Sequence, residues 1–217
     1  MKKIIIVLAV ALLISQFTQA QGTFTYVSNL GQPSAGSLVV ASNSWFAAGF
    51  FAGTNSGGYM LNSVQLEMAN ATLNPSGFTV MLYTNAPGVV GGIVPGTSLG
   101  TLNGSLNPVT AGTYTYTAPS NLTLSPSTIY YIVLTAGKII PDGYVWRLVG
   151  ANSYNPSDGW DAGGGLYHSS SGSSWTSFGS NFPQYAINAT AIPEPSSSVL
   201  LLLGSGIVIY VRRAFRR

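Results

Sequence analysis

Leu61-Asn-Ser-Val-Gln-Leu-Glu-Met68 decides the fold, because its side chains alternate in polarity. Val64, Leu66 and Met68 fall on one side of an extended chain, and the polar residues between them fall on the other. This period of two predicts a half-buried β-strand. Similar strand patterns occur at 78–83, 113–117, 129–134, 144–149 and 185–190, and weaker ones occur at 44–51, 98–104 and 122–124.

Turn-forming residues separate these patterns. Asn55-Ser-Gly-Gly58, Asn74-Pro-Ser-Gly77, Asn85-Ala-Pro-Gly88 and Pro141-Asp-Gly143 are typical of tight connections between short strands. Residues 22–192 contain no stretch with the 3.6-residue apolar spacing of a helix, and they contain no internal repeat that would favour a solenoid or propeller. The sequence therefore predicts an all-β fold, a single β-sandwich with jelly-roll or Greek-key connections.

The amino-acid composition excludes several classes of protein. Charged residues make up 6% of the chain, whereas about 25% is usual in soluble domains. The 46% hydrophobic content, with 4 Trp, 12 Tyr and 9 Phe, favours a packed core over disorder. Lys138 and Arg147 are the only lysine and arginine residues between 22 and 192, which excludes the clustered basic surface of a nucleic-acid-binding protein. Since the chain has no cysteine, its core must hold by packing without disulfides.

The first twenty residues are typical of a secretory signal peptide. Lys2 and Lys3 give a positive start, residues 4–14 are apolar, and small residues precede Gln21. We expect residues 1–20 to be removed by cleavage between Ala20 and Gln21. The alternative is a buried core helix.

The C-terminal segment, residues 193–217, has three parts in a fixed order. Pro193, Glu194 and Pro195 form an extended tripeptide that bars helix formation. Residues 199–211 are apolar and predict a short transmembrane helix. The basic residues that follow favour a cytoplasmic C-terminus, with the main domain outside the inner membrane. These are Arg212, Arg213, Arg216 and Arg217.

This order at residues 192–217 resembles the PEP-CTERM sorting signal, which exosortase recognises in exopolysaccharide-producing bacteria. The resemblance implies that Pro193–Pro195 is the recognition tripeptide, that 199–211 is the membrane anchor, and that the arginines retain the anchor. It also implies transient anchoring in the inner membrane before sorting to the surface, with exosortase as the processing partner. The alternative is a plain linker before a tail anchor.

Residues 21–192 form the expected extracellular domain. Residues 50–66, 122–134 and 169–178 resemble the choice-of-anchor domains, of the R type, which occur with several C-terminal anchors. The resemblance implies a cell-surface β-sandwich and brings no assigned activity.

Catalytic candidates are few. Gly96-Thr-Ser-Leu-Gly100 matches the G-x-S-x-G pattern, and Ser98 precedes candidate acids and His168 in hydrolase order. The acids are Asp142, Asp158 and Asp161. However, the nucleophile elbow needs a helix after the serine, and none is predicted there. The acidic residues permit a glycosidase pair without indicating one. We therefore expect no enzyme activity, with a secreted hydrolase as the weakest alternative.

Metal and cofactor sites are not predicted, with one exception. A single histidine and no cysteine exclude the usual zinc sites. Asp158-Gly-Trp-Asp161, followed by three glycines, is a weak calcium candidate because carboxylates in flexible loops bind Ca²⁺. The alternative is that both aspartates form turns.

Aromatic residues late in the chain suggest a binding face. Trp160, Tyr167 and Trp175 lie among Gly, Ser and Asn, a mixture that suits a sugar or another surface ligand. The alternative is that they fill the core. The whole sequence thus predicts a non-catalytic, exported protein of the cell surface or extracellular matrix, linked to exopolysaccharide and biofilm. The main alternative is a carbohydrate-binding or adhesive module with a polysaccharide partner.

Overall fold

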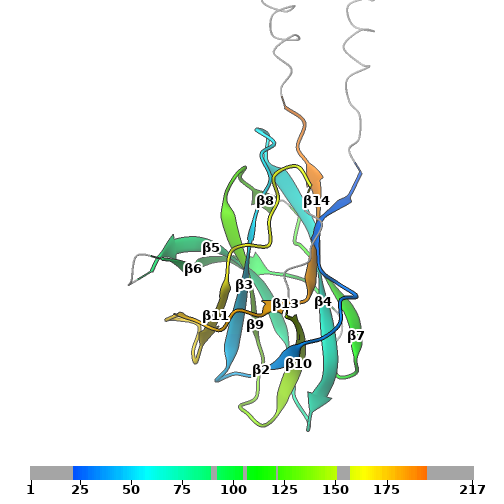
Figure 1. Ribbon diagram of the computed structural model, residues 1–217, viewed down its shortest axis with the longest axis vertical. Coiled ribbons are helices and arrows are strands. Elements are labelled where there is room, and N and C mark those ends of the chain that lie inside the picture. The colour runs from blue at the N-terminus through cyan, green and yellow to red at the C-terminus, as the bar shows by residue number, and fades with distance from the viewer. Residues whose placement is uncertain (1–21, 89–91, 105–106, 121, 151–156, 195–217) are drawn as a thin grey trace, which may run out of the picture. The chain divides into compact units, whose positions relative to one another are not determined.

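The computed structural model describes residues 22–88, 92–104, 107–120, 122–150 and 157–194 (Figure 1). Thr23–Ile192 form one compact unit, and the two chain ends are grouped into a second unit. The expected signal peptide, the apolar segment 199–211 and the arginine cluster lie outside the described residues. Within the described ranges there is no helix of sufficient length and apolar character to cross a membrane.

The described chain consists of antiparallel strands without helices. Fourteen strands are present in these residues: β1 (Phe24–Ser28), β2 (Gly36–Val40), β3 (Trp45–Phe51), β4 (Tyr59–Thr72), β5 (Thr79–Pro87), β6 (Ile93–Thr101), β7 (Gly112–Thr117), β8 (Thr123–Leu124), β9 (Ile129–Thr135), β10 (Gly143–Val149), β11 (Leu166–Ser169), β12 (Thr176–Ser177), β13 (Phe182–Pro183) and β14 (Tyr185–Ala191).

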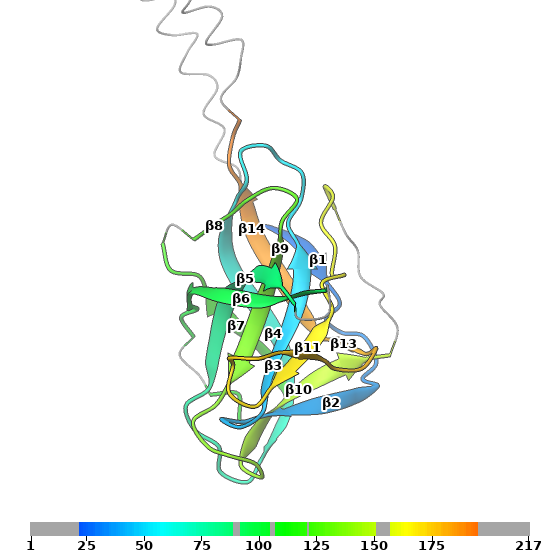
Figure 2. The same cartoon turned by 90° about the vertical axis from the view of Figure 1, so that its left-hand side faces the viewer.

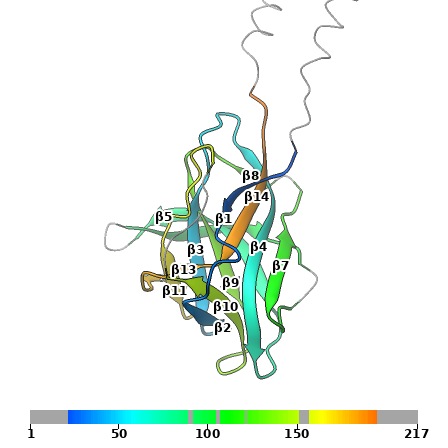
Figure 3. The same cartoon turned by 45° about the vertical axis from the view of Figure 1, so that its right-hand side comes forward.

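The strands form two sheets, as expected for a β-sandwich. The eight-stranded sheet runs β1-β14-β4-β10-β13, with β2 paired to β10 and with β7 and β8 paired to β4 (Figure 3). The six-stranded sheet runs β12-β11-β3-β9-β5-β6 (Figure 2). The all-β expectation is confirmed, and the jelly-roll or Greek-key connection stays a prediction.

Strand β4 organises the eight-stranded sheet. It contains the alternating segment 61–68 and extends beyond it to 14 residues. Tyr59–Leu66 pair with β14, whereas Met68–Thr72 pair with β10 on the next part of the strand. The opposite edge of β4 pairs with β7 and β8. The length of β4 therefore reflects four partner strands, two along each edge, which the local pattern alone does not show.

The core lies between the sheets. Val64, Leu66 and Met68 are fully buried, as their alternation predicts. The same core contains the largest fully buried side chains of the cluster: Trp146, Trp160, Tyr59, Tyr144, Tyr185 and Phe50. Burial of aromatic rings supplies much of the apolar area that a chain with few charges and no disulfides needs.

Candidate functional site

The predicted Ser-Asp-His order is not assembled into a catalytic triad. Ser98 is exposed on β6, at one edge of the six-stranded sheet. His168 lies on β11, where its ring packs against Phe46 at 5.1 Å and Phe178 at 5.7 Å. Strands β3, β9 and β5 separate β11 from β6, which corresponds to about 19 Å at the usual strand spacing. His168 therefore cannot serve as the base for Ser98 in this fold.

The acidic candidates are also dispersed. The Asp142 carboxylate accepts a hydrogen bond from the Asn74 N–H at 2.9 Å, which ties the β9–β10 connection to the loop after β4. Glu67 lies on β4 and accepts a hydrogen bond from the Thr113 hydroxyl at 2.5 Å. Neither carboxylate belongs to the loop of Asp158 and Asp161, so the glycosidase alternative gains no support.

Asp158 and Asp161 have structural roles in one loop. Asp158 adopts a left-handed conformation with φ of 52°, and its carbonyl accepts a hydrogen bond from the Thr54 N–H at 3.1 Å. Asp161 forms a β-bridge with Phe51 through hydrogen bonds of 2.7 and 3.3 Å. Within the described residues, no group of three or more His, Cys, Asp and Glu side chains could hold a metal ion. This geometry fits turn formation, the alternative to the calcium interpretation.

Trp160 lies in the core and not on a binding face. Its side chain is 2% exposed and stacks on Tyr26 at 4.8 Å and on Phe50 at 6.0 Å. Tyr59 meets it edge-on at 4.8 Å. The tight turn in which the Trp160 N–H donates to the Ser157 carbonyl at 2.9 Å directs the indole inward. The position of Trp160 in a Gly-rich loop therefore gave a misleading indication of exposure.

Tyr167 and Trp175 lie outside the core, on the outer side of the six-stranded sheet. Trp45 and Tyr83, which are also half-buried, pack against the same buried cluster as these two residues, and we call the four residues the aromatic face. Below them lies a buried cluster: Ala47, Ile129, Tyr131 and Val133.

Strand register explains why the aromatic face forms. Tyr83 on β5 is paired with Tyr131 on β9, and Tyr167 on β11 is paired with Ala47 on β3. The rings meet edge-on, Tyr83 with Trp175 at 6.5 Å and Tyr131 with Tyr167 at 5.6 Å. Sequence reasoning found two of the four members, because the other two come from distant strands.

Tyr131 beneath the aromatic face and Tyr83 within it stay neutral at physiological pH. Burial raises the pKa of Tyr131, and the neighbouring Tyr167 adds to this effect. Burial also raises the pKa of Tyr83 above its ordinary value of 10.0. The Tyr131 hydroxyl donates to the Ile93 carbonyl at 2.9 Å, which joins the β5–β6 hairpin to the sheet. The face thus offers apolar rings and neutral polar groups.

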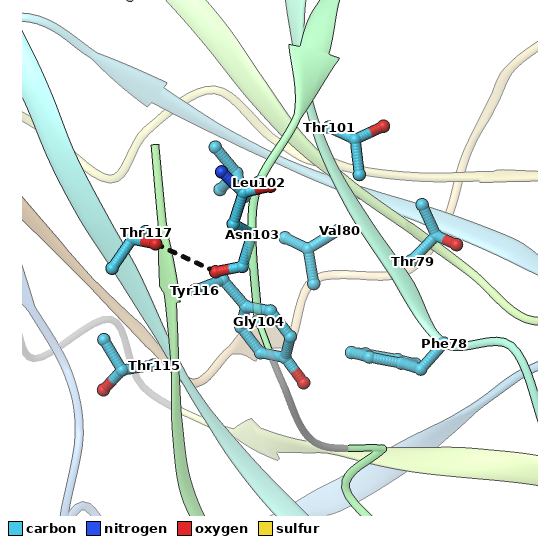
Figure 4. A pocket seen from close by; sticks show the side chains of 10 residues that line it. All are labelled: Phe78, Thr79, Val80, Thr101, Leu102, Asn103, Gly104, Thr115, Tyr116 and Thr117. Atoms are coloured by element: carbon cyan, nitrogen blue, oxygen red, sulfur yellow. Dashed lines mark hydrogen bonds between the residues drawn. The ribbon is translucent and has the colours of Figure 1, made fainter. Parts of the chain in front are cut away.

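A second surface feature is a hollow of about 580 Å³, which we call the threonine groove (Figure 4). It lies where the chain crosses from β6 of one sheet to β7 of the other. Its lining consists of Phe78, Thr79, Val80, Thr101, Leu102, Asn103, Gly104, Thr115, Tyr116 and Thr117. The sequence shows the Thr-Tyr alternation of β7 but gives no sign that these threonines meet β5 and the end of β6.

The sorting segment begins directly after the last strand. Phe24 of β1 pairs with Ala189 of β14, so the chain enters and leaves the sandwich at the same end (Figure 3). The Ile192 N–H donates to the Gly58 carbonyl at 2.9 Å, and the Asn55 amide donates to the Ile192 carbonyl at 2.9 Å. Pro193 and Glu194, the next two residues, are exposed. Pro195 and the arginines lie outside the described residues.

Comparison with known proteins identifies one part of the chain. No curated protein and no solved structure matches this sequence. The resemblance of the middle domain to choice-of-anchor proteins therefore stays a prediction. The family model of the PEP-CTERM protein-sorting motif matches residues 191–217. Such a motif implies export, membrane-anchored transit and exosortase-dependent sorting to the surface, and its match begins at the last residue of β14.

Proposed function

We propose that this chain is a non-catalytic protein of the cell surface or extracellular matrix, linked to exopolysaccharide and biofilm, which exosortase releases from a transient inner-membrane anchor. The observation that carries this proposal is the sorting motif at residues 191–217, which starts where the sandwich ends. The C-terminal arginines then lie in the cytoplasm before processing.

The hydrogen bonds of Ile192 support processing beyond the sandwich. Both backbone groups of Ile192 are engaged, by Gly58 and by the Asn55 side chain. The first residues past this point are Pro193 and Glu194, and proline favours an extended backbone that a processing enzyme can reach. Cleavage at or after Pro193 removes no residue of β14, so the folded domain stays whole.

The absence of catalysis is proposed from the candidate residues. Ser98 and His168 occupy different ends of the six-stranded sheet, and the carboxylates of Asp142 and Glu67 are engaged elsewhere. A surface or matrix protein needs a stable sandwich and no reacting groups, which fits this arrangement.

C-terminal mass spectrometry of the protein from membrane and surface fractions of its host tests the proposal. We expect surface material to end near Pro195 and to lack residues 199–217. Replacing both Pro193 and Pro195 by alanine should leave the protein in the membrane fraction with Arg217 retained, whereas Pro87→Ala, at an exposed proline of the β5–β6 hairpin, should be processed normally. Surface material that still carries Arg217 would contradict processing.

A second candidate function is a carbohydrate-binding or adhesive module. It is favoured by the gathering of Tyr167 and Trp175 with Trp45 and Tyr83 on one outer face. Half-buried aromatic rings can stack on the apolar faces of sugar rings, and a tyrosine hydroxyl or the Trp175 indole N–H can bond to sugar hydroxyls.

Binding of matrix polysaccharide purified from the host tests this second function. Trp175→Ala and Tyr167→Ala should each weaken binding to the polysaccharide. Phe178→Ala is a matched control, since Phe178 is an exposed aromatic that packs on His168 and Phe46 instead of belonging to the aromatic face. Unchanged binding in both aromatic-face variants would reject the face as the binding surface.

A further inference from the structure

We propose that the threonine groove is a binding site for a neutral polysaccharide chain, with Thr101 and Asn103 as its main hydrogen-bonding residues. This site shares no residue with the aromatic face or with the sorting motif. The inference rests on the proposed matrix location only for the supply of ligand, because the groove itself is built from the sandwich.

The walls of the groove are fixed by backbone hydrogen bonds to both sheets. The Leu102 N–H donates to the Val80 carbonyl at 2.8 Å, which holds this residue to β5. One residue later, Asn103 exchanges two hydrogen bonds of 2.7 Å with Thr117 on β7. The chain thus passes from one sheet to the other in a single step, and the hollow beside it keeps its shape without a ligand.

The floor of the groove is apolar and its rim is polar. Val80, Leu102 and Tyr116 are buried beneath it, and Phe78 packs against Tyr116 with ring centroids 5.7 Å apart. Gly104 crosses the Tyr116 ring so closely that a Cβ there would lie 2.1 Å from a ring carbon. Hydroxyl groups surround this floor (Figure 4): Thr79, Thr101, Thr115 and Thr117. An apolar floor with hydroxyls at its edge matches a sugar ring, which has apolar faces and a polar rim.

The polar side chains around the groove differ in whether they already have a hydrogen-bond partner within the protein. The Thr117 hydroxyl donates to the Asn103 carbonyl at 3.1 Å, and the Thr115 hydroxyl accepts from the Gln65 amide at 3.4 Å. In contrast, the Thr101 hydroxyl and the Asn103 side-chain amide have no hydrogen-bond partner among the described residues. A hydroxyl and an amide each combine donor and acceptor capacity, so together they complement sugar hydroxyls, which do the same.

The absence of charged side chains from the groove lining disfavours ionic ligands. None of its ten lining residues is charged. Burial raises the pKa of Tyr116, with Tyr114 and Tyr144 adding to the effect, so its phenol remains neutral at physiological pH. A phosphate, a carboxylate or an ammonium group would find no counter-charge here, and transfer from water would cost free energy without compensation.

The groove suits a saccharide better than an extended peptide. A peptide that added to β7 at Thr117 would need the backbone groups of that residue, but these already pair with Asn103. The volume of about 580 Å³ falls within the range of about 300–1,000 Å³ typical of small-ligand sites. It is open to a chain that continues beyond it, because Thr101, Asn103 and Thr117 are exposed.

Isothermal titration calorimetry with neutral oligosaccharides tests the inference on the full-length chain in a zwitterionic detergent, which avoids competition from sugar-based detergents. The probes are cellohexaose, xylohexaose and maltohexaose, with a hexamer of galacturonic acid as the anionic comparison. We expect at least one neutral hexamer to bind and the anionic hexamer not to bind. Thr101→Val and Asn103→Ala should each lower the affinity by about fivefold, the effect of one lost hydrogen bond, and the double variant should abolish measurable binding.

Thr97→Val is the matched control. Thr97 is an exposed threonine on the same strand, β6, outside the groove, and its replacement should leave affinity unchanged. Unfolding curves that superimpose on wild type show that the exposed variants remain folded. Failure of all three neutral hexamers to bind, or binding that the double variant retains, overturns the inference. If Trp175→Ala loses binding and the groove variants do not, the sugar binds to the aromatic face. A failure of C-terminal processing would leave both binding results unchanged, so the two proposals can fail separately.

Discussion

The outer faces of the two sheets differ in composition, because one carries polar side chains and the other carries aromatic rings. On the eight-stranded sheet, polar side chains bond to one another across the strands. The Asn188 amide lies at the centre, where it accepts from the Thr25 hydroxyl at 2.5 Å and donates to the Ser63 hydroxyl at 3.1 Å and to the Gln65 carbonyl at 3.4 Å. On the six-stranded sheet, the outer side instead carries the aromatic face above its buried cluster.

The contrast shows how a chain with 6% charged residues covers two sheets. We call Thr25, Ser63, Gln65 and Asn188 the polar face. Asn188 is buried at its centre and bonds to the other three side chains, which are exposed or half-buried and still meet water. The aromatic face is covered partly by its own loops. Gly172 lies so close to Trp45 that a Cβ on it would be 2.6 Å from a ring carbon. One face is therefore a solvated surface, and the other is a second, shallow core with exposed edges.

The aromatic face and the buried cluster beneath it should contribute strongly to the stability of the fold. Tyr131→Ala should have the largest effect, because Tyr131 is fully buried beneath the face and holds both Tyr167 and the Ile93 carbonyl. Loss of a buried aromatic side chain costs about 3–5 kcal/mol of unfolding free energy. Urea unfolding followed by tryptophan fluorescence measures this value. A loss below about 1 kcal/mol would show that the outer cluster is not a core.

Asn188→Ala is the corresponding change on the polar face, and its effect should be smaller. The substitution removes three side-chain hydrogen bonds but leaves the partners, Thr25, Ser63 and Gln65, within reach of water. We expect a loss of about 1–2 kcal/mol by the same urea measurement, since hydrogen bonds contribute modestly when water can replace them. A loss equal to that of Tyr131→Ala would mean that the polar network is as essential as the aromatic cluster.

Much of the fold was predictable from local pattern, and much of the aromatic face was not. The alternation at 61–68 and at 113–117 identified β4 and β7 because each strand buries one face. Strands β11, β12 and β13 have four, two and two residues, too few for a period to be recognised among Gly and Ser. Trp45 and Tyr83 could not be joined to Tyr167 and Trp175, because strand register places the first three residues on the sheet and Trp175 meets Tyr83 from the connection before β12.

Alkaline pH should lower the stability of the folded protein, with a smaller effect than the substitutions above. Burial raises the pKa of Tyr131 and Tyr83 above 10.0, so above about pH 10 the unfolded chain loses phenolic protons before the folded chain does. The folded state then binds more protons, and stability must fall as pH rises, whereas below about pH 10 this contribution is complete. Burial also raises the pKa of Tyr26, Tyr116 and Tyr144 in the core, so the decline belongs to several groups.

Tyr131→Phe should make the alkaline decline shallower. It should also cost about 1 kcal/mol at neutral pH through the lost bond to the Ile93 carbonyl. Urea unfolding from pH 7 to pH 11 measures both effects without disulfide exchange, because the chain has no cysteine. Tyr114→Phe, which loses a hydrogen bond of 2.8 Å to the Thr110 carbonyl on the eight-stranded sheet, controls for the missing phenol bond. An alkaline slope identical to wild type in Tyr131→Phe would contradict the role assigned to this tyrosine.

Gln65→Ala should have the smallest effect on the unfolding free energy. The result shows whether a side chain at the margin of the polar network matters less than Asn188 at its centre. The Gln65 amide donates to the Thr115 hydroxyl at 3.4 Å and its carbonyl accepts from Asn188 at 3.4 Å, both at the long end of the hydrogen-bonding range. Water can replace each of these weak bonds, so the unfolding free energy should change by no more than about 0.5 kcal/mol. If Gln65→Ala instead costs as much as Asn188→Ala, the polar side chains act as one cooperative network, and the two outer faces resemble each other energetically more than their composition suggests.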